Sequence, residues 1–189
     1  METRRLRAIT ALAALASAGC ALATPAAVRV CVDYGCDETR SAQVTPAEWQ
    51  SIADLFSATA DATAERTAIA EAVGKLETLV GDRVGTAGDA PRNSTLDTGV
   101  GQLDCIAESR NTHAYLELLA AGGLIAHHRI VERQVRHRWI FGTHWTAVVE
   151  ETATGERFAV DSWYGANGDP AIVQPLATWF EGRVPDAGI

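Results

Sequence analysis

The fold is decided by two stretches of the chain, G-Q-L-D-C-I-A-E-S-R-N-T-H at 101–113 and H-W-T-A-V-V-E-E-T-A-T-G-E-R-F-A-V-D-S-W at 144–163. In the first stretch, Asp104 is a residue type that caps helix N-termini, so it predicts a helix that begins at Cys105. In the second, two apolar runs flank the turn sequence A-T-G-E and predict a β-hairpin. A helix followed by an antiparallel hairpin indicates an α+β fold.

The register of this hairpin follows from its turn. If Glu151 pairs with Glu156, His144 lies opposite Trp163. Asp161 then lies on the same face of the sheet as His144, one diagonal step away. A slip of one residue would turn the two side chains to opposite faces. The favoured register therefore predicts that the side chains of His144 and Asp161 can meet.

Cys105, His144 and Asp161 together have the chemistry of a nucleophile, its base and the group that orients the base. The first turn of a helix offers unpaired backbone N–H groups and the positive end of the helix dipole, and both stabilise a thiolate. We therefore expect the pKa of the Cys105 thiol to lie well below its ordinary value. The alternatives are that Cys105 is an inert core thiol or that it joins a long-range disulfide.

The cysteines themselves indicate a compartment. Cys31, Cys36 and Cys105 follow Cys20 in the chain. Cys31 and Cys36 lie close together in V-C-V-D-Y-G-C-D, where Gly35 eases a turn, so in an oxidising compartment they are natural disulfide partners. That pairing leaves Cys105 as the odd thiol, which is unusual in an exported protein.

The beginning of the chain has the pattern of a secretory signal peptide. Residues 1–23 combine several arginines, a short apolar run at 8–18 and an A-x-A site at 21–23. The apolar run is too short to cross a bilayer comfortably. We therefore expect no membrane span, a single domain over 24–189 and an exported protein that is periplasmic or secreted. A lipid anchor at Cys20 is the alternative, although the leucine usual in a lipobox is missing.

Composition narrows the class of partner. The 189 residues carry a net charge of −8, and because residues 1–23 carry +2, the remainder carries −10. An acidic surface disfavours nucleic acid and anionic membranes as partners. A zinc site built from the histidines is also disfavoured. Adjacent strand residues such as His127 and His128 point to opposite faces, and neither a C-x-x-C nor an H-E-x-x-H spacing occurs. We expect no metal and no cofactor.

Other segments show helix, loop and strand patterns. They are helices from Thr45 to Ala60, from about 61 to 80 and from Cys105 to Gly122, a loop at 82–102, strands at 124–138 and 172–173, and a final helical turn at 175–180.

Two groups of polar residues leave alternatives open. Glu108, Ser109 and Thr112 share the face of their helix with Cys105, where they either line a polar pocket or form a structural hydrogen-bond network. The strand at 124–138 carries many arginine and histidine residues. They form either a positive patch that recognises a carboxylate or the charged, solvated surface of an edge strand.

The order and spacing of three motifs resemble the transglutaminase-like branch of the papain-like cysteine enzymes. The motifs are D-C at 104–105, H-W at 144–145 and F-A-V-D at 158–161. The chain also resembles an exported bacterial family of unassigned role. The resemblance to the cysteine enzymes implies a papain/transglutaminase-like fold, with N-terminal helices and a cysteine-bearing helix packed on a small antiparallel sheet that carries the histidine and the aspartate.

The same resemblance implies acyl transfer on a peptide or protein substrate, with hydrolysis of an amide or peptide bond favoured over transfer to an amine. The backbone N–H of Cys105, together with the side chain of Gln102, is the expected oxyanion site. The alternative function is a non-catalytic exported binding domain with the same fold.

Overall fold

The computed structural model describes residues 27–93, 99, 101–138 and 142–183. The predicted signal peptide at 1–23 and the alternative lipid anchor at Cys20 lie outside these residues. Among the described residues, no helix is long and apolar enough to cross a membrane.

The described chain forms two antiparallel sheets and four α-helices. The small sheet pairs β1 with β2, and the larger sheet has the order β3-β4-β5-β6 with every neighbouring pair antiparallel. The predicted α+β class is therefore confirmed. The elements are β1 (Val28–Cys31), β2 (Thr39–Ala42), α1 (Pro46–Ala53), α2 (Ala62–Val84), α3 (Cys105–Ala121), β3 (His128–Arg138), β4 (Gly142–Glu151), β5 (Arg157–Asp161), β6 (Ile172–Pro175) and α4 (Leu176–Phe180), with short 3-10 turns at Tyr34–Cys36 and Asp54–Phe56.

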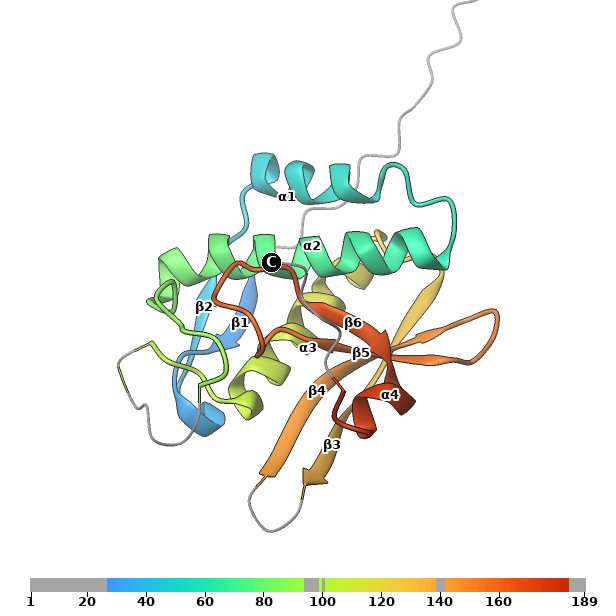
Figure 1. Ribbon diagram of the computed structural model, residues 1–189. Coiled ribbons are helices and arrows are strands. Elements are labelled where there is room, and N and C mark those ends of the chain that lie inside the picture. Colours follow the sequence, from blue (N-terminus) through green and yellow to red (C-terminus); the bar gives the residue numbers. More distant parts are fainter. Residues whose placement is uncertain (1–26, 94–98, 100, 139–141, 184–189) are drawn as a thin grey trace, which may run out of the picture.

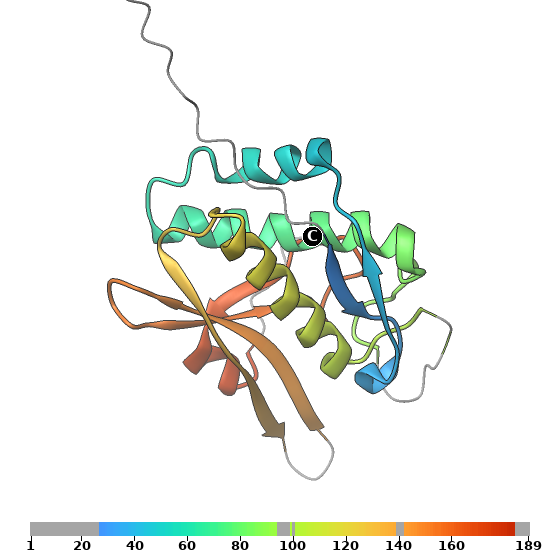
Figure 2. The same ribbon diagram turned by 180° about the vertical axis from the view of Figure 1, so that it is seen from behind.

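The two faces of the larger sheet are covered by different helices. Figure 1 shows α4 in front of the sheet and α3 behind it, and Figure 2, from behind, shows α3 in front. In both views α1 and α2 lie together at the top of the molecule. Because side chains alternate along a strand, Ala147 and Val149 enter the main core with α2 and α3, whereas Val148 packs with Leu176 and Trp179 of α4. The Cys-bearing helix thus lies on one face of the sheet and α4 on the other.

The helices begin at the capping residues that the sequence contains. Thr45 forms a capping box with Glu48 ahead of α1, and Asp61 accepts a hydrogen bond of 2.8 Å from the backbone N–H of Ala64 at the start of α2. Asp104 does the same for α3, accepting from Ala107 at 2.9 Å. These caps satisfy backbone donors that a helix start leaves without partners, which explains why the starts were predictable.

The predicted register of the β4–β5 hairpin is confirmed. The backbone N–H of Glu151 donates to the carbonyl of Glu156 at 2.8 Å, and the ladder continues to the pair Ala147–Val160. His144 and Asp161 accordingly share one face of the sheet. β3 pairs with β4 on its other side, and their register shifts between Val131 and Gln134. This irregularity lies on β3, which is an edge strand, in agreement with the edge-strand alternative for the arginine-rich segment.

Candidate active site

His144 and Asp161 are joined by a hydrogen bond. His144 lies near the start of β4 and Asp161 is the last residue of β5, and Nε2 of the imidazole is 2.7 Å from Oδ2 of the carboxylate. The carboxylate is an acceptor, so Nε2 carries the hydrogen in the neutral ring and Nδ1 is left as the basic nitrogen. Both side chains are buried, with exposed fractions of 11% and 2%. This arrangement fixes both the tautomer and the plane of the imidazole.

Aromatic rings enclose the imidazole on several sides. The ring centroids of Trp163, Tyr164 and Trp179 lie 4.7, 5.4 and 5.7 Å from that of His144. Trp179 also donates from Nε1 to Oδ2 of Asp161 at 2.7 Å, so one carboxylate oxygen receives two hydrogen bonds. Trp179 therefore orients Asp161, in the same way that Asp161 orients His144. Sequence analysis missed this role because Trp179 lies in a separate helix.

Arg136 contacts two of these aromatic residues, Trp179 and Tyr164. It stands directly opposite His144 in the β3–β4 ladder, and its guanidinium lies 4.5 Å above the ring of Trp179. It donates to the hydroxyl of Tyr164 at 2.6 Å and to the backbone carbonyl of Trp179. Arg136 is buried, so the expectation that this strand displays a solvated charged surface is wrong for this residue. Trp179 and Tyr164 supply partners for Nη1 and Nη2 of the buried guanidinium, whereas its Nε has no hydrogen-bond partner in the described structure.

Cys105 is the first residue of α3 and contacts the backbone of β4. The β4–β5 ladder ends at Ala147, and beyond that end the thiol donates to the carbonyl of Thr143 at 3.6 Å. The backbone N–H of Trp145 also interacts with the sulfur. Cys105 thus lies between the backbone groups on either side of His144. In the described part of the chain, the thiol forms no hydrogen bond with the imidazole, so the structure joins His144 and Asp161 directly and places the Cys105 sulfur against the backbone of β4 next to His144.

The expected thiolate is not supported by the surroundings of Cys105. Burial raises the pKa of the thiol, and the negative charges of Asp104 and Asp161 add to the rise. The backbone N–H groups of Trp145 and of Cys105 itself act in the opposite direction but do not outweigh burial. The prediction of a lowered pKa is therefore wrong for the resting protein. The prediction counted the helix dipole but not the charge of the adjacent Asp104, whereas packing against β4 and the charge of Asp161 depend on the tertiary structure.

Gln102 is engaged elsewhere. Its Nε2 donates to the carbonyl of Gly88 at 2.7 Å, and its Oε1 accepts from the backbone of Ala90 at 3.1 Å and from the side chain of Asn93. With both ends of the amide bonded to the preceding loop, Gln102 does not present an N–H group to the thiol. These bonds do not support the prediction of Gln102 as an oxyanion donor. The backbone N–H groups beside the sulfur, those of Cys105 and Trp145, are the donors that the structure offers instead.

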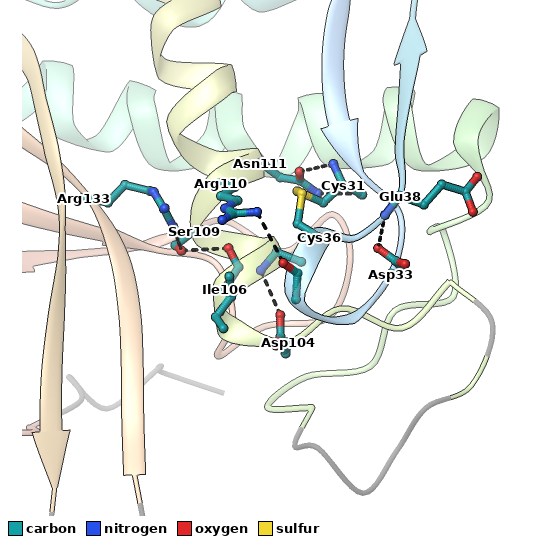
Figure 3. The surroundings of a disulfide bond; sticks show 12 residues. Cys31, Asp33, Cys36, Glu38, Asp104, Ile106, Ser109, Arg110, Asn111 and Arg133 are labelled. Atoms are coloured by element: carbon teal, nitrogen blue, oxygen red, sulfur yellow. Dashed lines mark hydrogen bonds between the residues drawn. A yellow bond between two sulfur atoms is a disulfide. The ribbon is translucent and has the colours of Figure 1, made fainter.

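The disulfide between Cys31 and Cys36 is formed, as predicted, and Cys105 is the free cysteine of the described chain. Asn111 links this region to the Cys-bearing helix, accepting from the backbone N–H of Cys31 at 2.7 Å and donating to its carbonyl at 3.0 Å (Figure 3). The disulfide therefore stabilises β1, the strand that ends at Cys31 and packs on the N-terminal half of α3.

The polar face of α3 forms a buried network rather than an open pocket. Ser162, which follows Asp161, donates to Glu108 at 2.6 Å and bonds to the hydroxyl of Thr112 at 2.9 Å. Burial raises the pKa of Glu108 well above its ordinary range, and burial likewise raises the pKa of Glu77 to about 7. Of the two alternatives for Glu108 and Thr112, the structure therefore supports the hydrogen-bond network. Sequence analysis did not find Glu77 as a member.

The structure contains no group of three or more histidine, cysteine, aspartate or glutamate side chains suited to a metal ion within the described residues. His128, one of the histidines considered for zinc, is buried and bonded through Nδ1 to Glu65 at 2.8 Å. That carboxylate also accepts from the backbone N–H groups of Ala126 and His127. His128 is thus a structural residue at the start of β3.

No protein-family model matches this chain, and comparisons with curated proteins and with solved structures gave no match.

Proposed function

We propose that this protein is an exported cysteine-dependent acyl-transfer enzyme that hydrolyses an amide or peptide bond through Cys105, His144 and Asp161. The observation that carries the proposal is the hydrogen bond between His144 and Asp161, with the Cys105 sulfur held against the backbone on either side of His144. A nucleophile, a base and a group that orients the base are the three parts that such catalysis needs. We further propose that the fold is related to the transglutaminase-like branch of the papain-like enzymes.

In the proposed reaction, the proton of the Cys105 thiol moves from the Thr143 carbonyl to Nδ1 of His144 as the sulfur attacks the substrate carbonyl carbon. The raised pKa of the thiol makes this general-base step necessary, because the resting nucleophile is protonated. Negative charge develops on the substrate oxygen, and backbone N–H groups beside the sulfur stabilise it. The imidazolium then protonates the leaving nitrogen as the C–N bond breaks. Water attacks the resulting thioester and gives a proton to His144; the C–S bond then breaks, His144 returns that proton to the Cys105 sulfur, and the acid is released.

Formation of an acyl-enzyme is the direct test. The protein is mixed with a p-nitrophenyl ester of an N-acetylated amino acid, and the burst of nitrophenolate and the acyl group on Cys105 are measured by absorbance and peptide mass spectrometry. We expect a burst with the wild type at pH 7.5 and none with Cys105→Ala. His144→Ala should slow acylation by roughly 100-fold or more, the usual contribution of a positioned base, and Asp161→Asn should have a smaller effect.

The matched control is His127→Ala, because His127 bonds through its backbone carbonyl to the N–H of Thr152 at 2.9 Å, at the turn end of the β4–β5 hairpin. It should acylate at the wild-type rate. Equal acylation rates for the wild type and His144→Ala would refute the enzyme proposal.

A non-catalytic exported binding domain is the second candidate. It is favoured by one observation, the raised pKa of the Cys105 thiol, which is expected for an inert half-buried cysteine. Under this alternative Cys105→Ala leaves ligand binding intact and none of the variants above changes acylation.

We also propose that residues 1–23 are a signal peptide and that the mature chain is periplasmic or secreted, without lipid on Cys20. The disulfide between Cys31 and Cys36 supports an oxidising location. Intact-mass measurement of the exported protein should give a chain beginning at Thr24 with the disulfide formed. A mass that includes a diacylated Cys20 would establish the lipoprotein alternative.

A further inference from the structure

One arginine extends from the irregular part of β3 toward the Cys-bearing helix. Arg133 lies where the β3–β4 register shifts, and its Nη1 donates to the hydroxyl of Ser109 at 2.8 Å (Figure 3). Its guanidinium carbon is 4.9 Å from the ring of Trp145. Ser109 lies one helical turn after Cys105 on the same face, and the backbone N–H of Trp145 interacts with the Cys105 sulfur. The bond to Ser109 therefore places the Arg133 guanidinium one helical turn along α3 from Cys105.

Arg133 has no carboxylate partner within the described residues, although this chain carries a net charge of −8. Arginine has five N–H donors, and one bond to a hydroxyl leaves most of them available. Two other arginines of the sheet do have a carboxylate partner. Arg129 and Arg157 both bond to Glu150. Arg136 on the same strand also has no carboxylate partner among the described residues, but it is buried and bonded to Tyr164 and to the Trp179 carbonyl, whereas Arg133 is half-buried and lines an open groove.

A second cation lies beside it. Arg110 on α3 donates to the carbonyl of Gly35 at 3.3 Å and likewise forms no ion pair among the described side chains (Figure 3). Burial lowers the pKa of Arg133, and the charge of Arg110 lowers it further. A bound anion would offset both the lost hydration of the Arg133 guanidinium and its repulsion by Arg110, because it accepts hydrogen bonds and carries a negative charge between the two cations.

The space in front of Arg133 is a groove of about 840 Å³ between α3 and β3, lined by His113, Ile130, Arg133, Gln134 and Trp145 among others. Two carboxylates, Glu117 and Glu132, also line it. Glu117 is paired with His113 at 3.4 Å. The groove thus offers the ring of Trp145 and a guanidinium without a carboxylate partner, and Arg133 connects it to Ser109, one helical turn after Cys105.

We propose that Arg133, assisted by Arg110 and Trp145, is a carboxylate-binding subsite, so that the substrate of Cys105 bears a free carboxylate close to the bond that is cleaved. An acidic side chain or the carboxyl end of a peptide both supply this chemistry. That this carboxylate belongs to a substrate rests on the proposed function. The binding of a carboxylate beside the thiol is independent of catalysis.

The test compares two small alkylating reagents of similar size, iodoacetate and iodoacetamide, that differ in charge. The rates at which each modifies Cys105 are measured at pH 9 by peptide mass spectrometry. The ratio of the iodoacetate rate to the iodoacetamide rate should fall roughly tenfold in Arg133→Gln, as expected from loss of a hydrogen bond to a charged group. Arg133→Lys should keep part of the preference. Arg129→Gln, on the same strand but paired with Glu150, is the matched control and should keep the wild-type ratio.

The wild-type protein alone supplies a second measurement. The ratio should decrease as salt is added, since screening weakens the attraction of an exposed site for an anion. Glutarate should protect wild-type Cys105 from iodoacetamide in a saturable manner and should not protect Arg133→Gln. Equal ratios for the wild type and Arg133→Gln, or the absence of saturable protection of the wild type, would overturn the proposal.

The two proposals fail separately. His144→Ala is expected to leave the ratio between the reagents unchanged, because it removes a base and not the subsite. If His144→Ala acylates normally while the ratio still depends on Arg133, the enzyme proposal is refuted and the subsite stands. If the triad variants behave as expected but the ratio is independent of Arg133, only the subsite is refuted. Acidic, amide-capped and free-carboxyl ester substrates then distinguish a side-chain carboxylate from a chain end.

Discussion

Trp179 and His144 hold the same oxygen of Asp161 from two directions. Nε1 of Trp179 and Nε2 of His144 each lie 2.7 Å from Oδ2. A carboxylate that receives two N–H donors in a buried site has little rotational freedom. Since Asp161 determines the tautomer and plane of the imidazole, the geometry of the proposed base depends on a residue of α4.

Trp179→Phe should therefore slow the acylation of Cys105 by severalfold at pH 7.5, because Asp161 loses one of its two donors while the aromatic packing is largely kept. The measurement is the nitrophenolate burst rate as a function of pH. Trp49→Phe is the matched control, because Trp49 is equally buried but its Nε1 has no hydrogen-bond partner in the described structure. A burst rate that falls equally in both variants would mean that Trp179 acts through stability alone.

The charge beside Cys105 predicts a pH effect. The Asp104 carboxylate contributes to the raised pKa of the thiol, so Asp104→Asn should lower that pKa. Asparagine still caps the helix, so α3 should remain intact. Asp61→Asn changes the equivalent cap of α2 and should leave the thiol unaffected.

The midpoint of the iodoacetamide rate against pH reports the pKa of the thiol. Because burial raises the pKa of the thiol, the wild-type midpoint should lie above the ordinary value for cysteine. The alkylation profile of Asp104→Asn should be displaced to lower pH. An unchanged profile would show that the carboxylate does not influence the sulfur.

The buried carboxyl of Glu77 predicts how stability varies with pH. Burial raises its pKa in the folded state from 4.5 to about 7, whereas the unfolded chain has the ordinary value. Between these values the folded state holds more protons than the unfolded state, so the free energy of unfolding falls as pH rises through this interval. The contribution is fully present below the unfolded pKa and is lost above the folded pKa.

Thermal melts at pH 5 and pH 8 test this sign. The wild type should melt at a lower temperature at pH 8, and Glu77→Gln should reduce the difference by roughly 2–4 °C or more. Glu108 and Asp89 also have raised pKa values, so part of the slope should remain. Glu71→Gln, at an exposed position of the same helix, should melt with the wild-type slope. A wild type that becomes more stable from pH 5 to pH 8 would contradict the assignment.

Close approach of two helices predicts a stability effect at Gly122. A Cβ atom built there would lie 2.1 Å from Cζ2 of Trp49, a buried ring that cannot easily move. Gly122→Ala should therefore lower the free energy of unfolding by about 1–3 kcal/mol. At Gly88 a Cβ would meet nothing within 4 Å, so Gly88→Ala is the control and should be nearly neutral. Urea unfolding measures both, and equal stability of the two variants would show that Trp49 yields at little cost.

Several features of the fold were determined by local sequence. The starts of the helices follow from Thr45, Asp61 and Asp104, because a cap and the donors it satisfies lie within three residues of each other. The register of the β4–β5 hairpin follows from its turn and from the period of two in a strand, so the meeting of His144 with Asp161 was predictable. The disulfide between Cys31 and Cys36 is also local.

Tertiary structure alone decided the electrostatics of the site. The pKa of Cys105 depends on burial against β4 and on two carboxylates, one of them from β5, and a helix-terminus argument does not include these terms. Gln102 was assigned from its closeness in sequence to Cys105, but its amide is satisfied by the loop from Gly88 to Asn93. Trp179 and Arg136 reach the site from α4 and β3, and no local pattern brings together elements so far apart in the chain. Sequence specified the elements and their faces because those depend on neighbouring residues, whereas burial and long-range partners exist only once the elements have packed.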